Sequence, residues 1–242
     1  MSVLAQVDGL VQATYERTFG PGFQVLSVLR GDRSVHPQGL LCEGTLEIDR
    51  DSEHVAGAEV FRPAGPRPVI VRCSRMVGLP RQLGDVFGIA VRVVDAYGPG
   101  RHQDLLCNSS RRPAPLNELF LPSPRWYANA YSSCLTFDAG AGPIIFGWEP
   151  PAVTGPGPGI EALRAEVADR GAVFGVSVAQ RLHRPAIIGT LTLRKPLPAD
   201  ADLNFDPITN TGGGLRPAGA LNMARSAVYR YSRRGRSAAT TA

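Results

Sequence analysis

The spacing of hydrophobic positions changes once along the chain. Over residues 1–18 apolar side chains from Leu4 to Tyr15 recur at helical spacing, which predicts a helix. Beyond about residue 40 the pattern changes to short β-rich runs separated by glycine and proline, which predicts strands joined by turns. The predicted strands are Leu40–Ile48, Val69–Arg75, Val86–Asp95, Gln103–Asn108, Ala130–Phe137, Pro143–Trp148, Ala172–Gln180 and Ala186–Arg194.

Eight such strands are enough to close a barrel, and closure removes exposed sheet edges. An amphipathic helix is predicted over Ile160–Arg170 and a last helix over Ala218–Arg234, while the proline-rich stretch Ser109–Trp126 is expected to be a crossing loop. Gly44 and Gly88 interrupt predicted strands and are expected to mark bulges or tight bends. Because neither a repeat nor a linker is visible, residues 1–242 are predicted to form a single domain of α+β class.

Charge and cysteine content narrow the possible functions. The net charge is +5, and arginine carries almost all of the positive charge, but the arginines are scattered apart from a basic tail near residues 225–236. A nucleic-acid partner is therefore not expected. The N-terminus lacks a signal-peptide pattern, and no apolar run is long enough to span a membrane, so no membrane association is expected. The four cysteines form no CxxC motif and are expected to be buried thiols in a reducing cytoplasm.

Tyr229 is the first candidate for chemistry. Arg225 precedes it by four residues on a predicted helix, and positions i and i+4 share a helix face. A free tyrosine has a pKa near ~10, and a nearby cation favours the phenolate that could bind ferric iron. Spacing alone favours an ordinary buried tyrosine, because Arg-x-x-x-Tyr is common.

His36 and Asn108 are the other two candidates. A histidine can move protons near neutral pH, and an asparagine amide can orient a bound peroxide. Taken singly, His36 is more often a structural histidine and Asn108 a turn residue. The other histidines, His54, His102 and His183, lie in turn-like segments and are expected at the surface.

Several segments together resemble the haem catalases and the small catalase-related peroxidases. The matches run in the same order as in that family, from about residue 30 to residue 235. The matching segments are Arg33-Ser-Val-His36-Pro-Gln-Gly39, Arg72-Cys-Ser74, Asp85-Val-Phe-Gly88-Ile-Ala90-Val91, Gln103-Asp104-Leu-Leu-Cys-Asn108, Phe205-Asp206-Pro207, and Arg225-Ser-Ala-Val-Tyr229 followed by Arg233 and Arg234.

The resemblance implies an eight-stranded antiparallel β-barrel with flanking helices and haem b bound between the barrel and the C-terminal helix. It implies His36 as the distal acid and base, Asn108 as its partner, and Ser74 as the group that orients the imidazole. Tyr229 would be the axial iron ligand, with Arg225 lowering its pKa. The remaining implied cofactor-binding residues are Val35 beside the distal histidine and Arg33, Arg72 and Arg233 (or Arg234) at the haem propionates.

The implied activity is reduction of hydrogen peroxide or organic hydroperoxides through a ferryl intermediate, with a small organic electron donor. The polar segment Ser109–Pro115 stands where the family has apolar and aromatic residues, which favours peroxidase use of larger substrates. Val35 argues against a hydroperoxide isomerase, because the related isomerases have threonine there. Two alternatives remain: a tailoring enzyme that uses the same haem on a dedicated small molecule, and a barrel that binds haem or another ligand without turnover. By resemblance, a homodimer is expected.

Overall fold

A computed structural model describes residues 38–76, 84–111, 120–180, 183–198 and 203–218. The predicted helix over residues 1–18, and that over 218–234 beyond its first residue, lie outside these ranges. Within them, no helix is long and apolar enough to cross a membrane.

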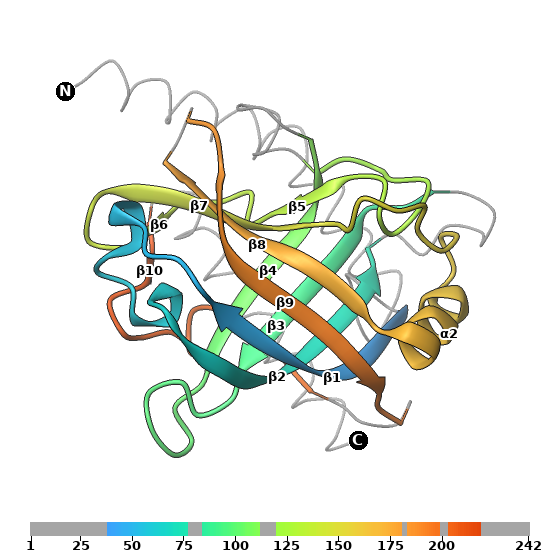
Figure 1. Ribbon diagram of the computed structural model, residues 1–242, viewed down its shortest axis with the longest axis horizontal. Helices are drawn as coiled ribbons and strands as arrows, with labels where there is room; N and C mark the ends of the chain where they lie inside the picture. Colours follow the sequence, from blue (N-terminus) through green and yellow to red (C-terminus); the bar gives the residue numbers. More distant parts are fainter. Residues whose placement is uncertain (1–37, 77–83, 112–119, 181–182, 199–202, 219–242) are drawn as a thin grey trace, which may run out of the picture.

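Eight strands close into an antiparallel barrel, as predicted (Figure 1). They pair in the order β7-β5-β4-β3-β2-β1-β9-β8, and pairing of β7 with β8 completes the ring. A short ribbon of β6 and β10 extends from β7. The bounds are β1 Gln38–Ile48, β2 Ala64–Arg75, β3 Phe87–Val93, β4 Gln103–Ser110, β5 Ala130–Ser132, β6 Phe137–Asp138, β7 Pro143–Glu149, β8 Ala172–Gln180, β9 Ala186–Pro196 and β10 Arg216–Pro217.

The helix predicted over Ile160–Arg170 is present with the same bounds as α2. It lies at one end of the barrel (right in Figure 1) and buries Leu163 and Val167. Two single-turn 3-10 helices, η1 at Glu53–Val55 and η2 at Glu59–Phe61, connect β1 to β2.

The core lies inside the barrel because alternate side chains of each strand point inward. In β2 the inward residues are Val69, Val71 and Cys73, and aromatic rings from β7 and β8 fill the remaining space. All four cysteines are buried and belong to no disulfide, as the sequence predicts. The polar residues of the site described below therefore belong to the opposite, outer face of the same strands.

Gly44 marks a bulge, as expected. The register of β1 with β9 shifts between Glu43 and Gly44. A Cβ at Gly44 would lie 2.2 Å from the backbone oxygen of Thr192, closer than any side chain permits. Glycine at this position therefore allows β9 to cross close to β1.

Candidate functional site

A row of small and polar residues crosses the outer face of four neighbouring strands. The pairing register aligns Gly39 of β1 with Ser74 of β2, Ser74 with Gly88 of β3, and Gly88 with Asn108 of β4. Directly paired residues of an antiparallel sheet project from the same face. Ser74 and Asn108 are thus brought to one face with only a glycine between them, roughly 10 Å apart at two strand spacings.

Gly88 and its surroundings make the middle of this face flat. Gly88 was expected to mark a bulge or bend, but its pairing is regular on both sides, so that expectation was wrong. Two residues further along, Ala90 pairs with Arg72 on one side and Leu106 on the other. Because Gly88 and Ala90 have small side chains or none, a planar group can lie close to the sheet between Ser74 and Asn108.

Arg72 borders the flat area and approaches Gly39. A Cβ on Gly39 would lie 2.8 Å from Nη2 of Arg72, so a larger residue there would displace the guanidinium. A planar cation suits recognition of a carboxylate. The described residues therefore fit a flat, acidic group such as haem: small residues beside its plane, an arginine for an acidic substituent, and two polar side chains on the same face.

The polar side chains of the row are buried. Ser74 is 4% exposed and Asn108 is 9% exposed. Ser110 lies two residues after Asn108 in β4, so its side chain projects from the same outer face, and it is 1% exposed. Among the described residues its hydroxyl has no hydrogen-bond partner. Sequence reasoning assigned Ser110 only to a polar loop segment and did not predict its place beside Asn108.

Six of the nine predicted site residues lie outside the described part of the chain. They are Arg33, Val35, His36, Arg225, Tyr229 and Arg233. The structure therefore brings together Ser74, Asn108 and Arg72, and the roles of all nine residues stay predictions. Gly39, three residues after His36 in the sequence, already belongs to the site row.

The other histidines are only partly at the surface. His183 is exposed, as expected, whereas His54 and His102 are half-buried. Nδ1 of His102 accepts a hydrogen bond from the backbone N–H of Asp95 at 3.0 Å. The ring therefore stabilises the turn between β3 and β4.

A buried ion pair lies beneath the site row, at the end of β2. Nε of Arg75 is 3.4 Å from Oδ2 of Asp85, and both side chains are fully buried. The backbone of Asp85 pairs with Ser123 in an isolated bridge. This arrangement ties the end of β2 to the crossing loop. Arg75 stands at an inward position of an apolar strand, and this sequence feature could have predicted a buried ion pair, but it was not used.

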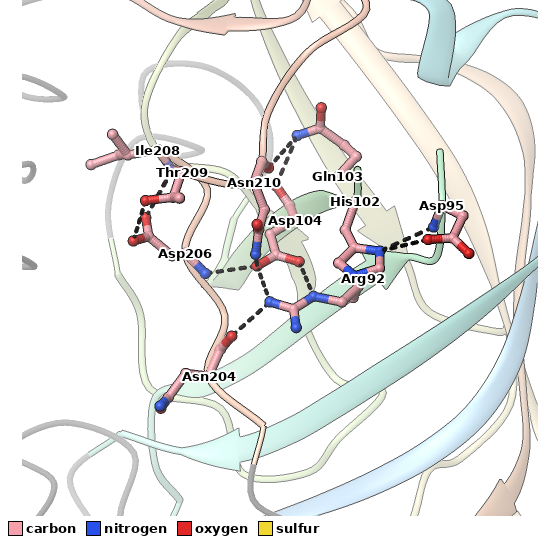
Figure 2. A network of polar contacts seen from close by, with 10 residues as sticks. All are labelled: Arg92, Asp95, His102, Gln103, Asp104, Asn204, Asp206, Ile208, Thr209 and Asn210. Carbon is pink, nitrogen blue, oxygen red and sulfur yellow. Dashed lines mark hydrogen bonds and ion pairs between the residues drawn. The ribbon is translucent and has the colours of Figure 1, made fainter. Parts of the chain in front are cut away.

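A second ion pair lies on the outer face of β3 and β4. The Arg92 guanidinium binds the Asp104 carboxylate through two hydrogen bonds, 2.7 Å from Nε to Oδ1 and 2.6 Å from Nη2 to Oδ2 (Figure 2). Asp104 belongs to a segment used for the resemblance, but neither residue was predicted to have a role. The sequence feature that could have predicted this ion pair is one charged residue in each of two neighbouring apolar strands.

Burial favours the neutral form of several thiol and phenol groups inside the barrel. Burial raises the pKa of the Cys42 thiol to about 12 and raises that of Cys73 well above its ordinary value. Burial likewise raises the pKa of Tyr131. Among the described residues no group of three His, Cys, Asp or Glu side chains is arranged to hold a metal ion. Candidate chemistry in the described chain is therefore concentrated on the outer face.

The fold is catalase-like. The structure is similar to a bacterial catalase, with a TM-score of 0.64 and 14% identity over 85% of this chain and 57% of that one. It is also similar to a fungal catalase, with a TM-score of 0.55 and 12% identity over 77% of this chain and 55% of that one. The similarity to catalase A from Saccharomyces cerevisiae has a TM-score of 0.55 and 12% identity over 77% of this chain and 57% of that one. The chain thus spans a little over half the length of these catalases. No protein-family model and no curated protein matches the sequence.

Proposed function

We propose that this protein is a haem-dependent, catalase-like peroxidase that reduces hydrogen peroxide or organic hydroperoxides. The observation that carries the proposal is the buried row Ser74–Gly88–Asn108 on the outer face of a catalase-like barrel. A flat surface with two polar groups at its edge suits a planar cofactor with a small reactant above it.

Haem b, when bound, supplies the redox chemistry that amino-acid side chains lack. Arg72 pairs with a propionate in this proposal, as do Arg33 and Arg233 by resemblance. By resemblance, Tyr229 would ligate the haem iron, and the positive charge of Arg225 would favour the ionised form of Tyr229. By resemblance, Val35 would be a further cofactor-binding residue.

Side chains of the protein transfer the protons in this proposal. His36 takes the proton from one peroxide oxygen and gives it to the other, so that the second oxygen leaves as water. The Ser74 hydroxyl fixes the imidazole orientation, and the Asn108 amide donates a hydrogen bond to the peroxide. Overall, hydrogen peroxide takes up two electrons and two protons and gives two waters, and a small organic donor loses the same number of electrons.

The polar character of β4 beyond Asn108 favours larger substrates. Ser110 follows Asn108 on the outer face, and Arg111 beyond it is exposed. Such residues can hydrogen-bond an organic hydroperoxide or donor, whereas hydrogen peroxide needs only the histidine and asparagine. A cytoplasmic homodimer without nucleic-acid or membrane partners completes the proposal.

Titration of the purified protein with hemin tests the cofactor. We expect a saturable Soret band with a high-spin ferric spectrum, which changes when hydrogen peroxide is added. Tyr229→Phe should weaken hemin binding at least tenfold or shift the Soret band, because the axial phenolate is lost. Unchanged affinity and spectrum in this variant would refute the axial assignment, and absence of a Soret band in wild type would refute haem binding altogether.

The distal roles need a variant that keeps the cofactor. His36→Ala should bind hemin normally but lose most of its reaction with peroxide, on the order of 10²-fold or more for loss of an acid–base group. Asn108→Ala should lose less, since it removes a hydrogen bond rather than the proton carrier. A full reaction in His36→Ala would instead favour a ligand-binding barrel whose haem reacts without the protein's assistance.

A further inference from the structure

A segment far along the sequence is bound to the same outer face that carries the candidate site. We call residues 203–217 the strap. It follows β9 in the sequence and crosses to β3 and β4, where it surrounds Asp104 (Figure 2). Residues after 218, which include the predicted axial ligand Tyr229, follow directly from it in the sequence.

The Asp104 carboxylate is the centre of this contact. It is fully buried and accepts four hydrogen bonds. Two come from Arg92, as above; the others come from the backbone N–H of Asp206 at 2.7 Å and from Nδ2 of Asn210 at 2.8 Å. The Asp104 backbone N–H also donates to the carbonyl of Asn210 at 2.9 Å. A buried carboxylate with this many donors is fully satisfied only when the strap is docked.

Arg92 holds the strap from the other side. Its Nη2 donates to the backbone carbonyl of Asn204 at 2.6 Å, in addition to Asp104. The guanidinium also lies over the ring of Phe205, 5.2 Å from its centroid. Three consecutive strap residues, Asn204 to Asp206, thus contact the ion pair that joins β3 and β4.

The strap also has structure of its own. Asp206 accepts hydrogen bonds from the backbone N–H groups of Ile208 and Thr209 at 3.0 and 3.2 Å and from the Thr209 hydroxyl at 2.9 Å. These bonds are local and do not require the barrel. Further on, Leu215 is buried in the core. Loss of the Asp104 contact would therefore release residues 204–210 while their local turn and the later anchor remain.

We propose that Asp104 is a positioning residue, which docks the strap and thereby sets the affinity of the neighbouring site for its cofactor. Asp104 and Asn108 lie on the same face of β4, four residues apart, and Arg92 and Gly88 have the same relation on β3. The strap and the site row therefore share two strands. The link to haem rests on the function proposed above, whereas the docking itself does not.

Asp104→Asn tests the proposal with little change in shape. The charge that balances Arg92 is lost, and the new amide nitrogen faces hydrogen-bond donors. In the haem-free protein we expect amide hydrogen exchange of residues 204–210 to accelerate at least tenfold. In hemin titrations we expect the dissociation constant to rise about tenfold, with a changed Soret maximum. Asn210→Ala, which removes one donor and keeps both charges, should give smaller changes in the same direction.

Two controls separate positioning from general damage. Glu166→Gln breaks an Arg–carboxylate pair on α2, 2.9 Å from Arg170, and should change neither readout. Gly44→Ala should lower thermal stability through β1 and β9 while leaving hemin affinity near that of wild type.

Each outcome decides a separate point. Unchanged exchange of residues 204–210 in Asp104→Asn would refute the docking role. Faster exchange with unchanged hemin affinity would refute the link to the site. Failure of wild type to bind hemin would refute the proposed function, and the exchange measurement would still decide whether Asp104 docks the strap.

Discussion

Two adjacent serines at the end of β4 differ in how their hydroxyls are satisfied. Ser109 donates to the carbonyl of Leu121 at 2.6 Å and accepts from the N–H of Phe87 at 3.0 Å. The buried Ser110 hydroxyl has no hydrogen-bond partner within the part of the chain that the structure describes. A buried polar group without a hydrogen bond costs roughly 1–3 kcal/mol. The two residues should therefore respond oppositely to the same substitution.

We expect Ser109→Ala to lower the free energy of unfolding by about 1–3 kcal/mol, because it leaves a backbone donor and acceptor unpaired. Ser110→Ala should leave the stability of the haem-free protein unchanged or increase it. Chemical denaturation of both variants without hemin is the measurement. An equal loss in both would show that the Ser110 hydroxyl has a partner.

Two glycines offer a second matched pair. At Gly44 an added methyl would meet the Thr192 carbonyl at 2.2 Å, whereas at Gly65 nothing lies within 4 Å. Gly44→Ala should cost about 1–3 kcal/mol, as expected for overpacking, and shift the thermal midpoint downward. Gly65→Ala should change stability by less than about 1 kcal/mol. Equal midpoints for the two variants would contradict the close approach of β9 to β1.

At the scale of elements, the strands were predicted closely but their partners were not. Alternation and turn residues located seven of the eight predicted segments to within a few residues, with β2 extended at its start. The run Ala130–Phe137 is instead two strands, β5 and β6. Cys134 adopts a left-handed backbone (φ 56°), and its N–H donates to the Ser132 hydroxyl at 3.0 Å. Hydrophobicity alone does not reveal such a turn.

The strap shows a second limit of sequence reasoning. Asn204 to Asn210 belong to no helix or strand, and their contact with Asp104 spans about a hundred residues of sequence. Hydrogen bonds within the Asp206 turn are encoded locally, because aspartate side chains commonly bond the next backbone N–H groups. The residues that bind this turn, Arg92 and Asp104, come together only when β3 and β4 pair.

At the scale of the whole molecule, buried neutral thiols and phenols predict sensitivity to alkali. Burial raises the pKa of Cys42 from 9.0 to about 12 and that of Tyr97 from 10.0 to about 12. The pKa values of Cys73 and Tyr131 are also raised by burial. In the unfolded chain these groups ionise at their ordinary, lower values. Their contribution to stability is therefore complete below about pH 9 and is lost as the pH rises toward 12.

We expect the free energy of unfolding to be nearly constant between pH 7 and 8.5 and to fall above pH 9. Each group contributes a slope of about 1.4 kcal/mol per pH unit while only its unfolded form is ionised. Denaturant titrations at successive pH values measure this slope. Cys42→Ala should make the decline shallower, and an unfolding free energy that stays constant to pH 11 would contradict the burial of these groups.

The sequence by itself determined the class of fold and the residues on each face of the strands. Alternation of apolar and polar positions fixes which side chains point inward, and this is a local property of each strand. The segments around Ser74 and Asn108 could be selected from the sequence because each is one short run of residues that resembles a catalase segment.

Only the tertiary structure decided which of these residues meet. The register of β2, β3 and β4 aligns Ser74, Gly88 and Asn108, and docking of the strap satisfies the Asp104 carboxylate. Register depends on packing of whole strands and on closure of the barrel, and a shift by one residue would move every side chain to the other face. Such contacts join residues distant in sequence, so no local pattern specifies them.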